Sequence, residues 1–526
     1  MPMLGHELAA QLACAARLGA DLPRHARVRI STEDARRIVQ GRLARRAENF
    51  LACAATAIYG NPHSPHARLL RHAGCEPGDL RTLVHAEGLE GALAALADRG
   101  VYVSVPEMKG RSDIVRGSLR FRARPRDFAQ PGLRTHFPVP TGGSGGAPIV
   151  VGRSLNEYRS VAPLFGLAIA AHGQRRPAHA LWQMLPTYQY VSSALGHPLL
   201  AWWYPHEPDS MLHRLGLRYA WLASRMAGIA LPYPRHGDAV TPTAVARFLG
   251  QARGDFPEIC LTAYSSAAVR LSLTAQELGI SLQHVLMACA GEPLTDTRSQ
   301  VISASGARPM NRYGTNESGS IAYGCAAARN VDDAHVSTDR FALIQRPVTV
   351  GSLGTQVSAF HFTSLVPWVP MVMLNTDVGD YGHAFTAKDC CGLGRAGYET
   401  HIQEIRSYEK LTGEAATFVV ADAARLVELV LPSTFGGSPL DYQLSEEESQ
   451  RGEMRLSVRV HPQVGEVDEA SVREVVLREL GSGGPVARHM AELWRSAGTV
   501  RVDRAAPHVT SAGKVLPFRR RGVGQS

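Results

Sequence analysis

The stretch that decides the fold is Pro138-Val139-Pro140-Thr141-Gly142-Gly143-Ser144-Gly145-Gly146-Ala147-Pro148. Its four glycines allow backbone amides to approach a polyphosphate closely, and the hydroxyls of Thr141 and Ser144 add hydrogen-bond donors. The apolar run Ile149-Val150-Val151 that follows has the composition of a strand. These features predict a glycine-rich phosphate loop between two strands, and they also fit a plain surface turn.

The same residues match a second pattern, G-x-S-x-G, in which Ser144 would be the nucleophile of a serine hydrolase. That pattern requires a helix directly after the serine turn. Pro148 and the apolar run behind it favour a strand instead, so the hydrolase is the weaker alternative. The segment also lacks the G-x-x-x-x-G-K-[ST] pattern of the common nucleotide-triphosphatase loop.

Outward from the loop, apolar strand-like runs such as Val285-Leu286-Met287 alternate with helical stretches, which predicts α/β layers. A second mixed segment near the end combines a strand at Met454–Val460, a helix at Ala470–Leu480 and a basic tail. We therefore predict an α/β fold with a large multi-layer N-terminal domain and a small mobile C-terminal α+β domain. The predicted divisions are 1–130 for a helical N-terminal region, 131–404 for the core and 405–526 for the small domain.

The N-terminal region is predicted to be mostly helical. Residues 31–59 have apolar residues at helical spacing, and Ser31 or Thr32 would cap this helix. The run Val101-Tyr102-Val103-Ser104-Val105 predicts a strand. Six arginines in residues 111–126 predict a solvated face, with recognition of an anionic ligand as the alternative.

Composition narrows the class of protein. The 526 residues carry a net charge of +9, which suits anionic partners such as nucleotides or coenzyme A. No zinc-finger spacing or basic platform with interleaved aromatic residues is present, so we expect no nucleic-acid partner. Eight cysteines without disulfide spacing predict a reducing cytoplasm. The N-terminus has no basic start and the longest apolar run is short, so we expect neither a signal peptide nor a membrane span.

Four further segments follow the loop. They are Ala290-Gly291-Glu292-Pro293-Leu294, Asn311-Arg312-Tyr313-Gly314-Thr315-Asn316-Glu317, Asn375-Thr376-Asp377-Val378-Gly379-Asp380 and Thr510-Ser511-Ala512-Gly513-Lys514. Each alone has a simpler explanation, namely an isolated turn, an acid at a helix start, a hairpin turn and a lysine in a basic tail. Together and in this order, they resemble the motifs of the adenylate-forming superfamily, which includes acyl-CoA ligases, luciferases and adenylation domains.

The resemblance implies a site for ATP and Mg²⁺. Glu317 and Lys514 would be catalytic, because a carboxylate suits Mg²⁺ and a lysine can stabilise charge as acyl-AMP forms. Tyr313 would stack on adenine, and Asp380 would accept the ribose hydroxyls. The residues implied to bind the nucleotide are Thr141, Gly142, Gly143, Ser144, Gly145, Gly291, Glu292, Pro293, Tyr313, Gly314, Thr315, Asn316, Asp380 and Arg406.

The sequence departs from the family patterns at several positions. Gly142 and Gly145 replace hydroxyl residues of the loop, and Ile149 replaces its terminal lysine. Asn316 and Val378 each stand where a threonine is usual. These departures keep a non-catalytic nucleotide-binding protein as an alternative.

Within the superfamily, the stretch from Ala73 to Leu80 resembles the phenylacetate–CoA ligase branch. That branch implies an aromatic or other small organic acid as substrate and coenzyme A as the acceptor of the acyl group. Position in the superfamily implies that Tyr188, Thr262 and Ser265 bind the acid. An amine acceptor, which would give an amide or N-acyl product, and a carrier-protein thiol are the alternatives. The sequence does not decide among them, nor between a monomer and a homodimer.

The same branch often carries a set of cysteines and a histidine, represented here by Cys325, His335, Cys390 and Cys391. Thiolates and imidazole suit a structural Zn²⁺ site. Because adjacent cysteines rarely bind one ion together, His383 or water would replace one of them. Ordinary buried thiols are the alternative to a zinc site.

Overall fold

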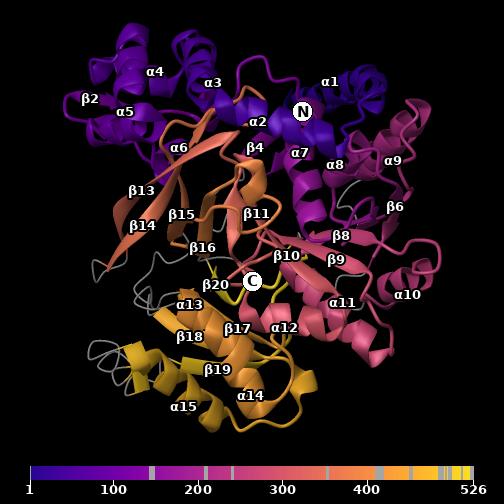
Figure 1. Ribbon diagram of the computed structural model, residues 1–526. Coiled ribbons are helices and arrows are strands. Elements are labelled where there is room, and N and C mark those ends of the chain that lie inside the picture. Colours follow the sequence, from indigo (N-terminus) through magenta and orange to yellow (C-terminus); the bar gives the residue numbers. More distant parts are fainter. Residues whose placement is uncertain are drawn as a thin grey trace.

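The computed structural model describes residues 2–140, 149–205, 211–237, 242–350, 355–408, 420–448, 454–483, 491, 494–495, 500–510 and 513–521. Within these ranges the chain forms a large α/β body and a small domain built on a separate sheet, which lies below the body in Figure 1. The predicted fold class is therefore confirmed. The divisions at 130/131 and 404/405 stay predictions, and β16 (Thr400–Ser407) spans the second of them.

A mixed sheet of 12 described strands forms the centre of the body. Its parallel half consists of β7 (Pro234–His236), β6 (Leu199–Tyr204), β5 (Ala178–Trp182), β8 (Ile259–Tyr264), β9 (Val285–Ala290) and β10 (Arg308–Thr315). Its antiparallel half continues with β11 (Gly319–Gly324), β12 (Ala334–Val336), β16, β15 (Thr376–Thr386), β14 (Thr355–Ser364) and β13 (Phe341–Val350).

Helices cover both faces of the parallel half. One face carries α1 (Pro2–Ala26), α2 (Thr32–Ala44), α7 (Leu155–Ala171), α8 (Thr187–Ala194) and α9 (Met211–Met226), and the other carries α10 (Thr243–Ala252), α11 (Ser265–Glu277) and α12 (Asp296–Ala304). In β9, Leu286 and Ala288 pack on the first face, whereas Val285 and Met287 pack on the second. The apolar run of β9 is continuous because the strand is buried on both faces.

The N-terminal region departs from prediction at two places. The single helix predicted over 31–59 is divided into α2, α3 (Arg46–Cys53) and η1 (Ala54–Tyr59). The strand predicted at Val101–Val105 is wrong, because only Val103 forms a bridge and α6 (Val105–Met108) begins at its end, where Ser104 and Glu107 form a capping box. The remaining elements there are α4 (Pro65–His72), α5 (Pro77–Asp98), β1 (Ile114–Arg116), β2 (Leu119–Phe121) and η2 (Pro125–Phe128).

The small domain is a four-stranded sheet with helices packed on it. The strands are β17 (Tyr442–Glu448), β18 (Met454–Val460), β19 (Val500–Arg504) and β20 (Phe518–Arg521), in the order β19-β18-β17-β20. The helices include α13 (Val420–Arg425), η5 (Leu426–Val430), α14 (Leu431–Phe435) and α15 (Glu469–Leu480), so the predicted strand and helix of this segment are confirmed. The end of the chain returns toward the body, where Figure 1 marks it between the two sheets.

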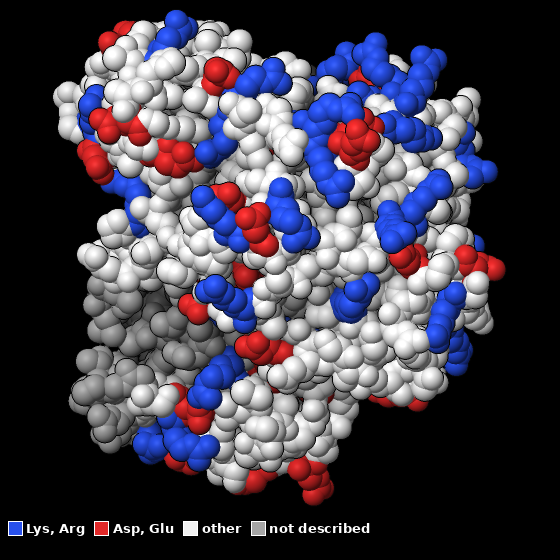
Figure 2. Space-filling model, viewed as in Figure 1, with Lys and Arg blue, Asp and Glu red and all other residues white. Residues whose placement is uncertain are grey.

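The surface and the helices agree with the expectations from composition. Figure 2 shows Lys and Arg side chains spread over the visible face, with Asp and Glu among them. Arg120 and Arg122 are exposed and pair with Asp113, as expected for a solvated face. Among the described residues, no helix has the length and apolar character that crossing a membrane would require.

Candidate functional site

Tyr313 and Asp380 meet where the two halves of the sheet join. Tyr313 lies on β10 and Asp380 on β15, and the Tyr313 hydroxyl donates to the Asp380 carboxylate at 2.9 Å. Burial, reinforced by the Asp380 charge, raises the pKa of Tyr313 well above its usual value, so the phenol keeps its proton. Gly314 follows, and a Cβ there would lie 2.3 Å from the Gly319 carbonyl oxygen. The structure thus brings together the two residues predicted to contact adenine and ribose.

Glu317 lies in the tight turn between β10 and β11. The backbone carbonyl of Glu317 accepts a hydrogen bond from Met371 at 3.2 Å, and the hydroxyls of Thr315 and Ser318 are 3.0 Å apart across the turn. The side chains of Thr315, Asn316 and Glu317 are half-buried. The turn follows Tyr313 directly, so the predicted magnesium ligand lies on the same edge as the predicted nucleotide residues.

Lys514 reaches from the small domain onto the body. Its Nζ donates to the carbonyl of Gly291 at 3.1 Å and lies 4.6 Å from the centre of the Tyr264 ring. Gly291 has φ +76°, and a Cβ there would lie 2.8 Å from Lys514 Nζ and 2.9 Å from Tyr264 Cδ1. Only glycine leaves room for the lysine at this turn.

The described residues on either side of positions 511–512 are bonded to each other next to Lys514. The Thr510 amide donates to the Lys514 carbonyl at 2.8 Å, and the Lys514 amide donates to the Thr510 hydroxyl at 3.0 Å. From the body, Arg270 donates to the Gly513 carbonyl at 3.3 Å, and the Ser266 hydroxyl accepts from the Val515 amide at 3.4 Å. The turn is therefore held both internally and by the body.

A buried arginine joins the small domain to the body beside this turn. Arg298, on α12, donates to Glu292 at 2.7 Å and to Glu428 of η5 at 2.9 Å, and it is 1 % exposed. It also donates to the Val515 carbonyl at 3.4 Å. Two carboxylates therefore compensate the charge of this buried guanidinium. Neither Arg298 nor Glu428 belongs to a recognisable motif, so the sequence analysis missed both.

The turn of Gly291, Glu292 and Pro293 differs from its prediction in one respect. The Glu292 carboxylate is buried and accepts hydrogen bonds from Arg298 and from Ser266, the latter at 2.7 Å. Ser265, predicted to bind the acid, donates to the Glu292 backbone carbonyl at 3.0 Å. In this structure both side chains support the turn itself.

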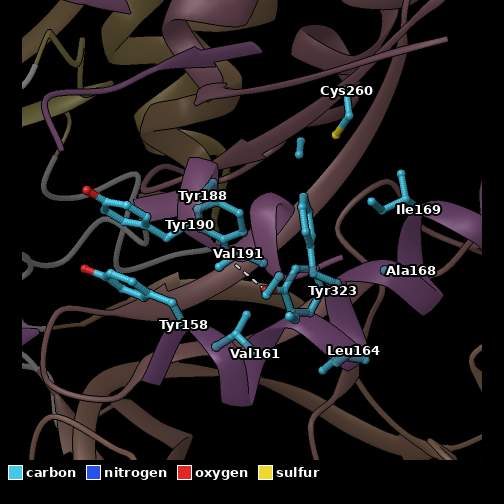
Figure 3. Packing of buried hydrophobic residues seen from close by; sticks show 14 of the residues in the cluster. Tyr158, Val161, Leu164, Ala168, Ile169, Tyr188, Tyr190, Val191, Cys260 and Tyr323 are labelled. Carbon is cyan, nitrogen blue, oxygen red and sulfur yellow. Dashed lines mark hydrogen bonds between the residues drawn. The ribbon is translucent and has the colours of Figure 1, made fainter. Parts of the chain in front are cut away.

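The other residues predicted to bind the acid lie on the face that α7 and α8 cover. The Tyr188 hydroxyl forms hydrogen bonds with Tyr323 at 2.8 Å and with Ser320 at 2.6 Å. Figure 3 shows Tyr188 among other buried aromatic residues, with the rings of Tyr158 and Tyr190 stacked beside it. Thr262 is buried on β8, and its hydroxyl has no hydrogen-bond partner among the described residues.

Arg406 lies on β16 next to Ser407, the residue that pairs with Asp380. The Arg406 guanidinium donates to Asp332 at 3.4 Å and to the Ile405 carbonyl at 2.8 Å. The structure therefore places Arg406 near the strand of the predicted ribose ligand, and its guanidinium bonds to Asp332 and to its own strand.

The predicted phosphate loop, Thr141 to Pro148, lies outside the described residues. Its flanks are described: β3 (Phe137–Pro140) and β4 (Val150–Arg153) pair antiparallel, with Pro140 opposite Val150. The strand predicted after the loop is thus confirmed. Among the described residues after the loop, β4 comes first and α7 begins at Leu155, whereas a serine-hydrolase turn needs a helix directly after the serine.

The cysteine and histidine residues singled out in the sequence come together at one point. One ligand atom from each of Cys325, His335, Cys390 and Cys391 lies within 4.8 Å of the others. The Cys325 and Cys390 sulfurs are 3.7 Å apart, and His335 Nε2 lies 3.6 Å from Cys390 and 3.1 Å from Cys391. Both adjacent cysteines belong to the group, and His383 does not, which corrects the expectation that one cysteine would be replaced.

The surroundings of this group fix its ligand atoms. His335 Nδ1 donates to the Tyr398 carbonyl at 2.6 Å, which leaves Nε2 facing the sulfurs. A hydrogen bond from Cys325 and the contact with His335 together hold the pKa of Cys391 well below its usual value, against the effect of burial. His401 lies 3.6 Å from Cys390 and contacts Asp333 at 2.7 Å. Sequence spacing did not single out His401 or Asp333.

This chain is similar to known proteins in its structure rather than in its sequence. No protein-family model and no curated protein matches the sequence. A solved structure of 2-hydroxyisobutyryl-CoA ligase, in the postadenylation state with 2-HIB-AMP, is similar with a TM-score of 0.52 at 14 % identity, over 95 % of this chain and 92 % of that one.

Two further solved structures share lower similarity. ATP-bound MatB from Rhodopseudomonas palustris matches at 13 % identity with a TM-score of 0.40, over 82 % of this chain and 72 % of that one. The amide bond synthetase McbA from Marinactinospora thermotolerans matches at 15 % identity with a TM-score of 0.38, over 86 % and 90 %. The TM-score of the CoA ligase structure is above 0.5, and this likeness shows the fold alone: the chain shares the architecture of adenylate-forming enzymes.

Proposed function

We propose that the protein is an ATP-dependent ligase that activates a carboxylic acid as acyl-AMP and then transfers the acyl group to a thiol. The observation that carries the proposal is the contact of Lys514 with Gly291. A lysine from a separate domain approaches the same sheet edge on which Tyr313 and Asp380 meet. The Lys514 amine lies 3.1 Å from the Gly291 carbonyl. When substrates are bound, the reacting carboxylate and the α-phosphate could take the place of this carbonyl as hydrogen-bond acceptors of the amine.

The nature of residue 514 supports the same conclusion. The chain has four lysines among 56 basic residues, so arginine supplies nearly all of its positive charge. An ammonium is a compact point charge that fits between two oxygens, whereas a guanidinium is wide and planar. The use of lysine at this turn, in a chain that otherwise uses arginine, therefore supports a role for Lys514 in stabilising charge between two oxygens.

The proposed reaction balances without a protein nucleophile. A carboxylate oxygen of the acid attacks the α-phosphorus of ATP, the bond to the β-phosphate breaks, and pyrophosphate leaves. Glu317 would hold Mg²⁺, which neutralises charge on the departing group. Lys514 would stabilise the charge that develops between carboxylate and phosphate. The acceptor then attacks the acyl carbon, and AMP leaves.

For the acid we propose an organic acid small enough to lie beside Tyr188 and Thr262, as the phenylacetate–CoA ligase resemblance implies. Coenzyme A is the proposed acceptor, with an amine as the second candidate. Exchange of labelled pyrophosphate into ATP, measured over a panel of acids, tests the first half-reaction. Supplying coenzyme A or amines to the productive acid and identifying the product by mass tests the second. If none of the acids supports exchange, the proposal is rejected.

We also propose that Cys325, His335, Cys390 and Cys391 bind one structural Zn²⁺. Bonds of about 2.3 Å to sulfur and about 2.05 Å to nitrogen, at tetrahedral angles, separate two sulfurs by about 3.8 Å and a sulfur from a nitrogen by about 3.6 Å. The Cys325–Cys390 distance of 3.7 Å and the His335–Cys390 distance of 3.6 Å fit these values. The carbonyl of Tyr398 on the far side of the imidazole is the usual outer partner of a zinc-bound histidine.

A further inference from the structure

Arg312 is a buried cation that has no anionic partner among the described residues. It lies on β10 and is 8 % exposed, and its Nε and Nη1 are buried without a hydrogen-bond partner. Its guanidinium carbon lies 3.7 Å from the centre of the Tyr188 ring. Arg298, by contrast, is a buried arginine of the body that pairs with the carboxylates of Glu292 and Glu428.

A cation in this state is unfavourable for the protein by itself. Removing a guanidinium from water costs more than a ring face returns, unless hydrogen-bond acceptors of opposite charge complete its surroundings. Such a group is a candidate for function, because an anionic ligand would supply what the protein does not.

The position of Arg312 relates it to Lys514. Strand register places Tyr264, Ala290, Arg312 and Tyr323 in one row across β8, β9, β10 and β11. Lys514 lies over Tyr264 and bonds to Gly291, the residue after Ala290. In this row, Ala290 alone stands between Arg312 and Tyr264, the residue that Lys514 contacts. Ala290 has the smallest side chain of the four.

Arg312 also faces away from the proposed nucleotide residues. Side chains alternate along a strand, so Arg312 and its neighbour Tyr313 lie on opposite faces of β10. Tyr313 packs with the aromatic cluster of the antiparallel half, whereas Arg312 contacts Tyr188 on the α7/α8 face. On that same face the Thr262 hydroxyl also has no hydrogen-bond partner among the described residues. Two unsatisfied polar groups therefore lie on the side where the acid is proposed to bind.

We infer that Arg312 binds a second carboxylate of the substrate, so that the acid is a dicarboxylic acid with one carboxylate activated beside Lys514. The inference rests on the proposed function and names its substrate class. A guanidinium binds a carboxylate through two parallel hydrogen bonds, which makes it selective for a fixed second anion. The competing role for Arg312 is to hold the carboxylate that reacts.

The test compares pyrophosphate exchange for acids matched in skeleton: butyrate with succinate, hexanoate with adipate, and benzoate with isophthalate. We expect kcat/KM for one diacid to exceed that for its matched monoacid by about 100-fold. This ratio corresponds to the cost of removing one partner from a buried charge pair. Arg312→Gln should remove this preference by raising KM for the diacid, and Arg312→Lys should retain part of it. Arg308→Gln, on the same strand but exposed, is the control and should leave the preference unchanged.

The outcomes separate the two proposals. The inference would be overturned if monoacids were preferred over every diacid. It would also be overturned if Arg312→Gln lowered exchange equally for both members of a pair. Either result would leave the ligase proposal standing. If no acid supports exchange, the ligase proposal fails, and calorimetric titration of the same acids without ATP decides the inference alone. Diacid binding that Arg312→Gln abolishes would support it, and equal binding of both members of each pair would contradict it. Circular dichroism and the thermal midpoint establish that each variant is folded.

Discussion

Lys514 donates a hydrogen bond to the carbonyl of Gly291 at 3.1 Å, although 223 positions of sequence separate the two residues. The contact joins the small domain to the body at the carboxyl end of β9. It depends on the left-handed conformation of Gly291 and on the absence of a side chain there. The proposed first half-reaction therefore depends on a glycine as much as on a lysine.

Gly291→Ala should lower pyrophosphate exchange sharply, because the added Cβ would overlap both Lys514 Nζ and the Tyr264 ring. The backbone strain adds about 1 kcal/mol, and displacement of the lysine is expected to cost about 10²-fold in rate. Exchange kinetics measure the effect. Gly279→Ala is the control, since Gly279 also has positive φ but has open space around it. Equal effects of the two substitutions would mean that strain alone is responsible.

Glu428→Gln should weaken the docking of the small domain, because it removes one of the two carboxylates that pair with Arg298 among the described residues. We expect exchange to slow by about tenfold or more, which corresponds to about 1.4 kcal/mol. Transfer from preformed acyl-AMP to the acceptor should slow less, because Lys514 is not needed for that step. Glu474→Gln, which breaks the exposed pair with Arg495, should change neither rate. Equal slowing of both half-reactions by Glu428→Gln would argue against a docking role.

Protein purified without chelators should contain about one zinc per chain, as measured by atomic emission. Cys325→Ser should lose the metal and lower the thermal midpoint by several degrees, because the site joins β11, β12 and the segment before β16. Cys53→Ser, outside the group, should do neither. A metal-free protein of unchanged stability would show that these are ordinary buried thiols.

Stability should fall as the pH drops below about 6.5. Burial lowers the pKa of His25, His66, His197 and His361 to about 4, from an ordinary value of 6.5. Between these values the unfolded chain binds protons that the folded chain does not, so the free energy of unfolding is full above pH 6.5 and declines toward pH 4. Each histidine contributes roughly 3 kcal/mol to that decline.

Urea denaturation at pH 7.5, 6.0 and 5.0 measures this dependence. His66→Gln should flatten it, because His66 is buried and its Nε2 donates to the Val372 carbonyl, so that protonation would place a charge inside the protein. The exposed His63 offers the control His63→Gln, which should leave the slope unchanged. A free energy of unfolding that is constant from pH 7.5 to 5.0 would contradict the assignment of neutral buried histidines.

The secondary-structure pattern and the order of the motifs could be predicted from the sequence, because both depend on residues that are close together in the chain. Alternating strand and helix patterns predicted the α/β body, and the order of motifs predicted which residues the sheet edge would gather, including Tyr313 with Asp380. The resemblance to the phenylacetate–CoA ligase branch singled out Cys325, His335, Cys390 and Cys391, and their contact depends on β11, β12 and the turn before β16. Metal binding by this group and nucleotide binding by Tyr313 and Asp380 stay predictions.

What sequence could not supply were contacts between distant segments without motifs. Arg298 and Glu428 are 130 positions apart, and nothing local marks either as a partner. The strand predicted at Val101–Val105 failed because Ser104 and Glu107 cap a short helix within it. Arg312 was open to prediction, since alternation along β10 places it opposite Tyr313, but its lack of a partner is visible only in three dimensions.

The most direct test of the central claim is pyrophosphate exchange by Lys514→Ala with the acid that the wild-type protein uses. We predict acid-dependent exchange in the wild type and a loss of at least about 10²-fold in Lys514→Ala, because one positioned charge stabiliser contributes about that much. Lys514→Arg should recover little of it, and Lys388→Ala, an exposed lysine, should behave as wild type. Exchange that persists at the wild-type rate in Lys514→Ala would contradict the account.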